Sequence, residues 1–184
     1  MDAKEIRELT NKCIDLRLEA ISYLKKMEEL FNKIRDRLRA QNIYALYGED
    51  CKITNMEFED NGDIMFQFCE ELASSVNHIP YFYISDFVKN WPADIKEVLK
   101  PVIIEVFLYE KLFKKCEELE SEAKDLYKKY GSYVKQAARV NVYRIWKRFS
   151  GLKYYKIEYR LAQLESMKND LENLSDEELI SENQ

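Results

Sequence analysis

The residue types that most often carry catalysis or hold metal ions are few in this chain and lie far apart. His78 is the single histidine, and no two of the four cysteines are close in sequence. Zinc sites need closely spaced ligand pairs, and most acid–base or nucleophilic sites use a histidine. The chain also lacks glycine-rich phosphate-binding loops and the common hydrolase motifs. We therefore predict a protein that is not an enzyme and that uses no metal and no cofactor. The cysteines are expected to be reduced thiols: Cys13, Cys51, Cys69 and Cys116.

One segment combines basic and aromatic residues in a chain whose formal net charge is −5. Ten basic residues and a single acid, Glu158, fall between Lys128 and Arg160, together with eight of the 24 aromatic residues. Proteins that bind single-stranded nucleic acid use cations to neutralise phosphates and flat rings to stack on bases. The candidate binding residues are Lys135, Arg139, Tyr143, Arg144, Lys147, Arg148, Lys153, Tyr154 and Lys156.

Helical spacing divides this segment into two sides. Arg144, Lys147 and Arg148 share one side of a helix, opposite an arc formed by Val134, Ala138, Val142, Ile145 and Phe149. Phe149 and Trp146 are therefore expected in the core, and Tyr143, Tyr154 and Tyr155 at the surface. Segment 133–160 would contact RNA, single-stranded DNA or a nucleic-acid-binding protein. A basic helix side can also pair with acids of its own chain or face water.

An acidic segment offers a second function. Between Gly48 and Glu71 eight acids oppose one lysine, Lys52. The alternative prediction is a small acidic inhibitor or regulator, for example a nuclease inhibitor, that docks on a protein partner. Acids on a solvent-facing strand also serve as ordinary protection of a sheet edge. The candidate docking residues are Glu57, Glu59, Asp60 and Asp63.

The first helix is predicted over residues 4–41 and has a heptad seam of apolar residues. Leu24, Phe31 and Leu38 widen its apolar arc, which favours packing against two helices. A second alternative is a structural coiled coil, a homo-oligomer held through this helix. The seam consists of Ile6, Leu9, Cys13, Leu16, Ala20, Tyr23, Met27, Leu30 and Ile34.

A small antiparallel sheet is predicted over residues 51–85, where apolar and polar residues alternate around Asp60-Asn61-Gly62. A three-residue loop places Phe58 opposite Ile64 and Met56 opposite Phe66, which gathers the apolar side chains on one face. Gly62 is then expected in the left-handed region, in a bulge. Residues 80–85 are the expected third strand.

Three further helices complete the prediction. A long helix over 92–130 should kink or break at Pro101 and stop at Gly131. A short basic helix over 133–149 and a C-terminal helix over 152–174 should follow, before a frayed tail over 175–184. The predicted fold is mainly α with a small antiparallel β-sheet (α+β): a single domain, 1–184, in which a bundle or coiled coil of long helices carries an inserted hairpin or three-stranded meander.

The cellular compartment is predicted from segments that the sequence lacks. Its first residues contain no apolar signal core, and no stretch reaches the ~20 apolar residues that a membrane span requires. We expect a cytoplasmic protein that does not contact a membrane.

Overall fold

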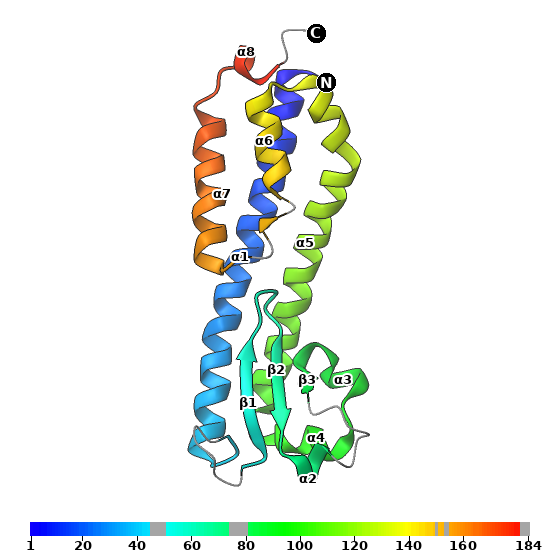
Figure 1. The fold of residues 1–184 in the computed structure, drawn as a ribbon, viewed down its shortest axis with the longest axis vertical. Helices are drawn as coiled ribbons and strands as arrows, with labels where there is room; N and C mark the ends of the chain where they lie inside the picture. The colour runs from blue at the N-terminus through cyan, green and yellow to red at the C-terminus, as the bar shows by residue number, and fades with distance from the viewer. Residues whose placement is uncertain (45–50, 74–80, 150, 153–154, 181–184) are drawn as a thin grey trace. The chain divides into compact units, whose positions relative to one another are not determined.

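The computed structural model is mainly helical and contains one three-stranded antiparallel sheet, as predicted (Figure 1). It divides into two compact units, residues 1–23 with 115–184 and residues 24–114. Helices α1 (Ala3–Ala40) and α5 (Ile103–Ala137) contribute residues to both units, and the prediction of a single domain stays a prediction. The structure describes residues 1–44, 51–73, 81–149, 151–152 and 155–180.

Helix α1 (Ala3–Ala40) buries the wide apolar arc that its sequence predicts. Asp2 and Glu5 cap its beginning, because each side chain accepts a hydrogen bond from the backbone N–H of the other, at 2.9 and 2.8 Å. The chain leaves the helix at Asn42, whose φ of 58° lies in the left-handed region. Leu9 and Tyr23 of the seam are half-buried. The buried residues of the arc include Ile6, Cys13, Leu16, Ala20, Leu24, Met27, Leu30, Phe31, Ile34 and Leu38.

The unit of residues 24–114 contains the sheet, whose strand order is β1-β2-β3. Met56 pairs with Phe66 and Phe58 pairs with Ile64, so the predicted register is confirmed. The third strand, predicted over 80–85, is present over 81–83 as β3 and pairs antiparallel with β2. The prediction was wrong for Ile84 and Ser85, which belong to the 3₁₀ turn η2 (Ile84–Asp86), and Pro80 lies outside the described residues. The strands are β1 (Ile53–Phe58), β2 (Ile64–Phe68) and β3 (Tyr81–Tyr83).

Gly62 closes the β1–β2 hairpin with a φ of +88°, as the three-residue loop predicts. The Gly62 N–H donates to the Glu59 carbonyl oxygen and the Glu59 N–H donates to that of Asp63, each at 2.9 Å. This pair of bonds is typical of a type I turn that ends in a bulge.

Short helical segments follow β2 and β3, and the ring of Trp91 lies among the aromatic residues of this region. The Trp91 ring contacts those of Phe66, Phe68, Phe82 and Phe87, with centroids 5.0–5.8 Å apart. Its indole N–H donates to the Tyr83 carbonyl oxygen at 2.8 Å. The segments are α2 (Glu70–Ala73), the 3₁₀ turn η2 (Ile84–Asp86), α3 (Phe87–Asn90), α4 (Ala93–Val98) and the 3₁₀ turn η3 (Lys100–Val102).

The predicted helix over 92–130 is broken at Pro101, as expected, but it does not stop at Gly131. Helix α5 (Ile103–Ala137) runs through Gly131. A glycine inside a helix costs only about 1 kcal/mol relative to alanine. Burial of Val134 and Ala137 in the next turn offsets that cost. The prediction of one helix over 133–149 was therefore wrong in its first turn, which belongs to α5.

The unit of residues 1–23 with 115–184 is a helical bundle (Figure 1). Its other helices are α6 (Val140–Phe149), α7 (Ile157–Glu172) and α8 (Asp176–Leu179). Arg17 of α1 pairs with Glu120 of α5 at 3.3 Å, and Lys168 of α7 pairs with Asp15 of α1.

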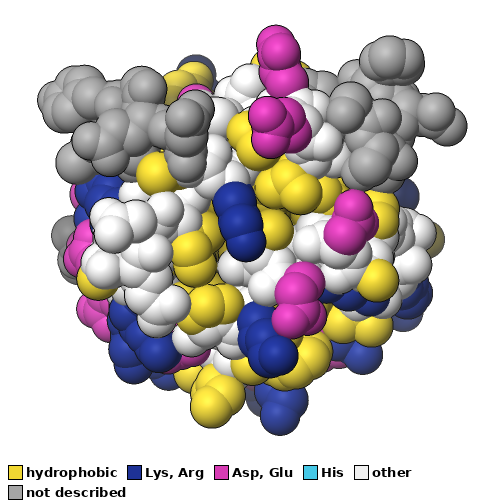
Figure 2. Space-filling model, turned by 90° about the horizontal axis from the view of Figure 1, so that it is seen from below, with side chains coloured by type: hydrophobic (Ala, Val, Ile, Leu, Met, Phe, Trp, Pro, Cys, Tyr) yellow, Lys and Arg dark blue, Asp and Glu magenta, His cyan; other side chains and the backbone are white. Residues whose placement is uncertain are grey.

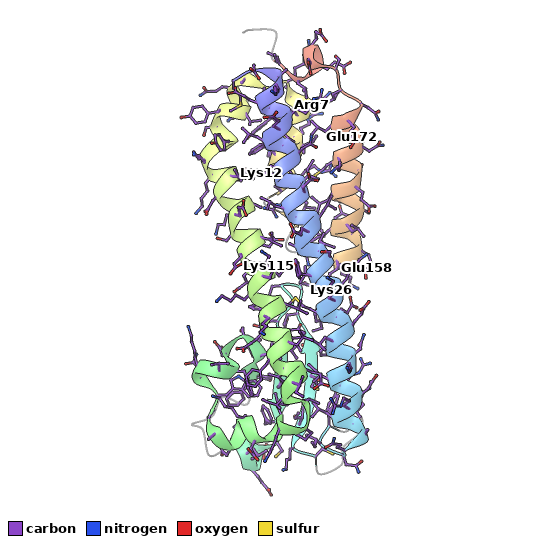
Figure 3. All side chains as sticks on the ribbon, turned by 180° about the vertical axis from the view of Figure 1, so that it is seen from behind. Arg7, Lys12, Lys26, Lys115, Glu158 and Glu172 are labelled. Carbon is purple, nitrogen blue, oxygen red and sulfur yellow. The ribbon has the colours of Figure 1, made fainter. Side chains whose placement is uncertain are left out.

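The end of α7 is held by α1. Arg7 donates to the carbonyl oxygens of Leu171 and Leu174, at 2.9 and 2.7 Å, and lies beside this end of α7 (Figure 3). The predicted frayed tail was wrong for residues 175–180, because Ser175 and Glu178 form a capping box and Leu179 is fully buried. Residues 181–184 lie outside the described residues. Across the described residues, no helix has the length and apolar character that crossing a membrane would require.

Candidate nucleic-acid interface on α6

After its first residue, the exposed Val140, helix α6 places its apolar and its basic residues on different sides. Val142, Ile145, Trp146 and Phe149 are buried. Asn141, Arg144, Lys147 and Arg148 are exposed on the other side. The helix contains no acidic residue. The division of this segment into a core side and a basic side is therefore confirmed for α6.

Trp146 fixes how α6 lies in its unit. The indole N–H donates to the Thr10 hydroxyl oxygen at 2.8 Å, and that hydroxyl donates to the Ile6 carbonyl oxygen at 2.7 Å. The indole ring also contacts the rings of Tyr127 and Phe149, at centroid distances of 6.2 and 5.9 Å. Both polar groups in this buried contact are satisfied, so α6 has one well-defined orientation.

Arg139 precedes α6 and is committed to the chain itself. Its backbone N–H donates to the Leu179 carbonyl oxygen at 3.0 Å, and its Nε donates to that of Ile180 at 2.9 Å. Ala138 forms an antiparallel bridge with Ile180 beside it. Arg139 thus anchors the segment after α8. Because its side chain is used in this contact, we no longer count Arg139 among the residues that bind a partner.

The predicted cations of α6 lie together at the surface. Lys147 and Arg148 lie three and four residues after Arg144, so each is its neighbour on the helix surface. Lys135 of α5 adjoins them, because its Nζ lies 5.8 Å from the centroid of the half-buried Tyr143 ring. We call Lys135, Tyr143, Arg144, Lys147 and Arg148 the α6 cationic surface.

Arg144 and Arg148 lack acidic partners within the part of the chain that the structure describes. Neither guanidinium has an acidic partner within 4.0 Å among the residues that the structure describes. Like charges spaced four residues apart on a helix destabilise it by a few tenths of a kcal/mol. Arg148 lies in the last turn of α6, where a cation is favourable to the helix dipole, but Arg144 lies in the middle of the helix and gains no such stabilisation. Helix stability therefore does not explain the charge of Arg144.

The remaining predicted residues follow α6. Lys156 is exposed at the N-cap position of α7, and Lys153 and Tyr154 lie outside the described residues. Tyr155 is exposed, as predicted for the surface group, and its ring centroid lies 4.7 Å from that of Tyr159.

Sequence reasoning missed three residues of the segment 133–160. Tyr133 and Tyr159 are exposed, and neither stood among the candidates. Arg160 counted as one of the ten cations but is buried. Its position three residues after Ile157 and four before Leu164, both buried, was the signal that could have placed it on the inner side of α7.

The acidic hairpin presents fewer charges than its sequence indicates. Glu57 and Asp60 are exposed, Glu59 is half-buried and Asp63 is buried. One carboxylate oxygen of Asp63 accepts from the backbone N–H groups of Ile64 and Ser85, at 2.9 and 3.1 Å. The other accepts from the Ser85 hydroxyl at 2.5 Å. Asp63 therefore supports the hairpin and does not offer its charge to a partner.

Burial raises the pKa of two acids of the hairpin, Asp63 and Glu59. The pKa of Asp63 is raised by burial, against the lowering effect of its hydrogen bonds from Ser85 and Ile64. The pKa of Glu59 is raised by burial and then by the charges of Glu57, Asp63 and Asp60. These shifts follow from the packing of the hairpin and do not by themselves indicate catalysis.

The other candidate chemical groups are placed as follows. Burial raises the pKa of Cys13 to about 11 and that of Cys116 to about 12, so neither thiol is a nucleophile near neutral pH. Within the described ranges, no three histidine, cysteine or acidic side chains are grouped as metal ligands. His78 lies outside those ranges. No protein-family model, curated protein or solved structure matches the chain.

Proposed function

We propose that this chain is a non-catalytic binding protein, a helical scaffold that contacts single-stranded RNA or DNA through the α6 cationic surface. The observation that carries the proposal is the exposure of Arg144, Lys147 and Arg148 on one side of α6, beside Lys135. Three adjacent cations are a suitable match for a phosphate backbone, whose neutralisation releases bound counterions and so favours association.

The packing of α6 supports this proposal. Because Trp146 and Phe149 anchor the inner side, the cations stand on a rigid helix, and a polyanion would not have to order it. Exposed aromatic side chains are also available in the segment, since Tyr133, Tyr155 and Tyr159 are about half exposed or more. Rings of this kind stack on bases without sequence preference. A nucleoprotein would present the same phosphates.

The two alternatives receive less support. Of the four docking acids predicted for an inhibitor, Asp63 is buried and hydrogen-bonded and Glu59 is half-buried, which leaves only Glu57 and Asp60 exposed. A coiled-coil oligomer through α1 would need an apolar side of that helix, but the apolar arc of α1 is already buried within this chain. The four free cysteines are consistent with a location in the cytoplasm, which is part of the proposal.

Fluorescence anisotropy tests the proposal with labelled oligo(U) RNA and oligo(dT) DNA at low salt. The first variant replaces Arg144, Lys147 and Arg148 with alanine. The matched control replaces three exposed lysines elsewhere, Lys25, Lys33 and Lys124, and so removes the same charge. We expect the α6 variant to bind roughly tenfold or more weakly than the control. Equal weakening in both variants, or no binding by the unmodified protein, would contradict the proposal.

A further inference from the structure

The beginning of α5 exposes hydrophobic side chains on the side opposite its core. Val106, Tyr109 and Phe113 are buried, as expected for the inner side of an amphipathic helix. On the outer side Ile104 is 78% exposed, Phe107 47% and Leu108 50%. Figure 2 shows hydrophobic side chains at the surface between lysine, arginine and acidic ones. Single exposed apolar residues are ordinary, but a contiguous group indicates a binding surface.

A pocket of about 320 Å³ adjoins these side chains in the same unit. Its apolar walls come from α3, at Phe87 and Val88, and from the first turns of α5, at Ile103 and Phe107. Val88 is itself 51% exposed. Lys96, Glu97 and Lys100 complete the lining. We call Val88, Ile104, Phe107, Leu108 and this pocket the Phe107 surface.

Ring packing and hydrogen bonds fix the walls of this pocket. The Phe87 ring contacts the rings of Trp91 and Phe107, at centroid distances of 5.0 and 6.2 Å. The Lys96 ammonium donates to the Val88 carbonyl oxygen at 2.9 Å and lies 5.7 Å from the Phe87 ring centroid. The concavity is therefore formed before any partner binds.

The charges around the Phe107 surface are mostly positive. Lys111 and Lys114 continue the exposed side of α5 in the two turns after Leu108. In the described part of the chain neither lysine pairs with an acid, and Lys89 after Val88 also has no such partner.

The neighbouring acids are already engaged. Glu105 is buried in an ion pair with Arg37. Glu110 accepts a hydrogen bond from the Val88 backbone N–H. Glu97 pairs with Lys100 at 3.3 Å, but both side chains are exposed, so a partner's acid could share Lys100 at little cost.

We propose that the Phe107 surface binds an amphipathic helix of another protein, whose apolar side carries flanking acidic residues. One apolar side chain of that helix would enter the pocket, and the next would lie over Ile104 and Leu108, as in other helix-in-groove complexes. Its acids would meet Lys100 at one end and Lys111 and Lys114 at the other.

Two other occupants fit the same observations less well. A second copy of this chain, bound through the same surface around a two-fold axis, would bring the lysines of one copy against those of the other. A membrane surface is attracted by lysines, but it offers no protruding side chain to fill a fixed pocket.

Methyl NMR titration tests this proposal with a synthetic helical probe peptide. The probe carries leucine at positions i, i+3 and i+7 and glutamate at the flanking positions, and its partner probe has lysine in place of glutamate. We expect the methyl resonances of Val88, Ile104 and Leu108 to shift with the acidic probe and to shift far less with the basic one. Shifts confined to other methyl groups, or equal shifts with both probes, would overturn the proposal.

Variants of exposed side chains test the same surface, because such substitutions are not expected to disturb folding. Ile104→Ser combined with Leu108→Ser changes exposed side chains, and we expect it to weaken binding of the acidic probe by roughly tenfold. Tyr81→Thr, at another exposed ring of the same unit, is the matched control and should leave binding unchanged. Two further outcomes would also overturn the proposal. One is dimerisation through this surface, measured by light scattering. The other is binding to phosphatidylserine vesicles that the double variant abolishes, together with no binding of the acidic probe.

Discussion

Helix α6 and the β1–β2 hairpin carry opposite charges, and they differ in how far their charged side chains are exposed to solvent. In α6, Arg144, Lys147 and Arg148 all point to solvent. In the hairpin, Asp63 points inward and is held by hydrogen bonds from Ser85 and Ile64. The same kind of sequence signal, a run of like charges, therefore describes a surface in one place and an internal support in the other.

The physical difference lies in what each charge can reach. The Ile64 N–H, together with the N–H and hydroxyl of Ser85 in η2, donates to the Asp63 carboxylate, so its burial is partly compensated. The Arg144 and Arg148 guanidinium groups are exposed, and α6 supplies no acid to pair with them. Their charge remains available to an external anion. This contrast is the reason for assigning binding to α6 rather than to the hairpin.

The largest expected effect concerns the inner side of α6. Trp146→Ala removes a fully buried ring and leaves the Thr10 hydroxyl without its donor, so the free energy of unfolding should fall by about 3–5 kcal/mol. Urea denaturation measures this change. Tyr133→Ala, at an exposed ring of the same unit, should change stability by less than about 0.5 kcal/mol. Similar losses in the two variants would show that α6 is not anchored by Trp146.

The hairpin turn should show the next largest effect. A Cβ on Gly62 would lie 2.5 Å from Leu24 Cδ2 and 2.7 Å from Met27 Cε, at a φ of +88°. Gly62→Ala should therefore destabilise the protein by about 1–3 kcal/mol in urea denaturation.

Gly131→Ala is the matched control for Gly62→Ala. A Cβ at Gly131 has no heavy atom within 4 Å, and the residue lies inside α5. This change should stabilise the protein by about 0.5–1 kcal/mol. If the two variants shift stability in the same direction, the account of the turn is wrong.

The smallest expected effect concerns Asp63 and is a change in how the stability of the protein depends on pH. Because its pKa is raised in the folded state, the folded protein binds this proton more tightly than the unfolded chain does. The contribution of Asp63 to stability should therefore be most favourable below its usual pKa of 3.8 and should decline as pH rises through the raised value. In Asp63→Asn this decline should disappear from urea midpoints measured across that range. Asp60→Asn, at an exposed site, is the control. If stability declines with rising pH as much in Asp63→Asn as in this control, the decline is not caused by Asp63.

The spacing of apolar residues along the sequence was sufficient to predict the register of the hairpin and the buried side of α6. The register of β1 and β2 followed from where Met56 and Phe66 place their side chains, and the core position of Trp146 followed from helical periodicity. These features need only the alternation of side chains along a strand or around a helix.

Features set by distant partners were not predictable in this way. Asp63 is buried because Ser85 lies 22 residues further along the chain. Arg139 leaves the candidate interface because the segment after α8, 41 residues away, accepts its hydrogen bond. The continuation of α5 through Gly131 likewise depends on burial in the next turn, which outweighs the local preference of glycine for a helix end.

The salt dependence of nucleic-acid binding tests the central claim most directly. For labelled oligo(U), the logarithm of the association constant should fall linearly with the logarithm of salt concentration. Replacing Arg144, Lys147 and Arg148 with alanine should reduce the magnitude of that slope by about 2, because each lost phosphate contact removes about 0.7 for a single strand. The control at Lys25, Lys33 and Lys124 should keep the slope of the unmodified protein. An equal slope in all three proteins would contradict the assignment of nucleic-acid binding to α6.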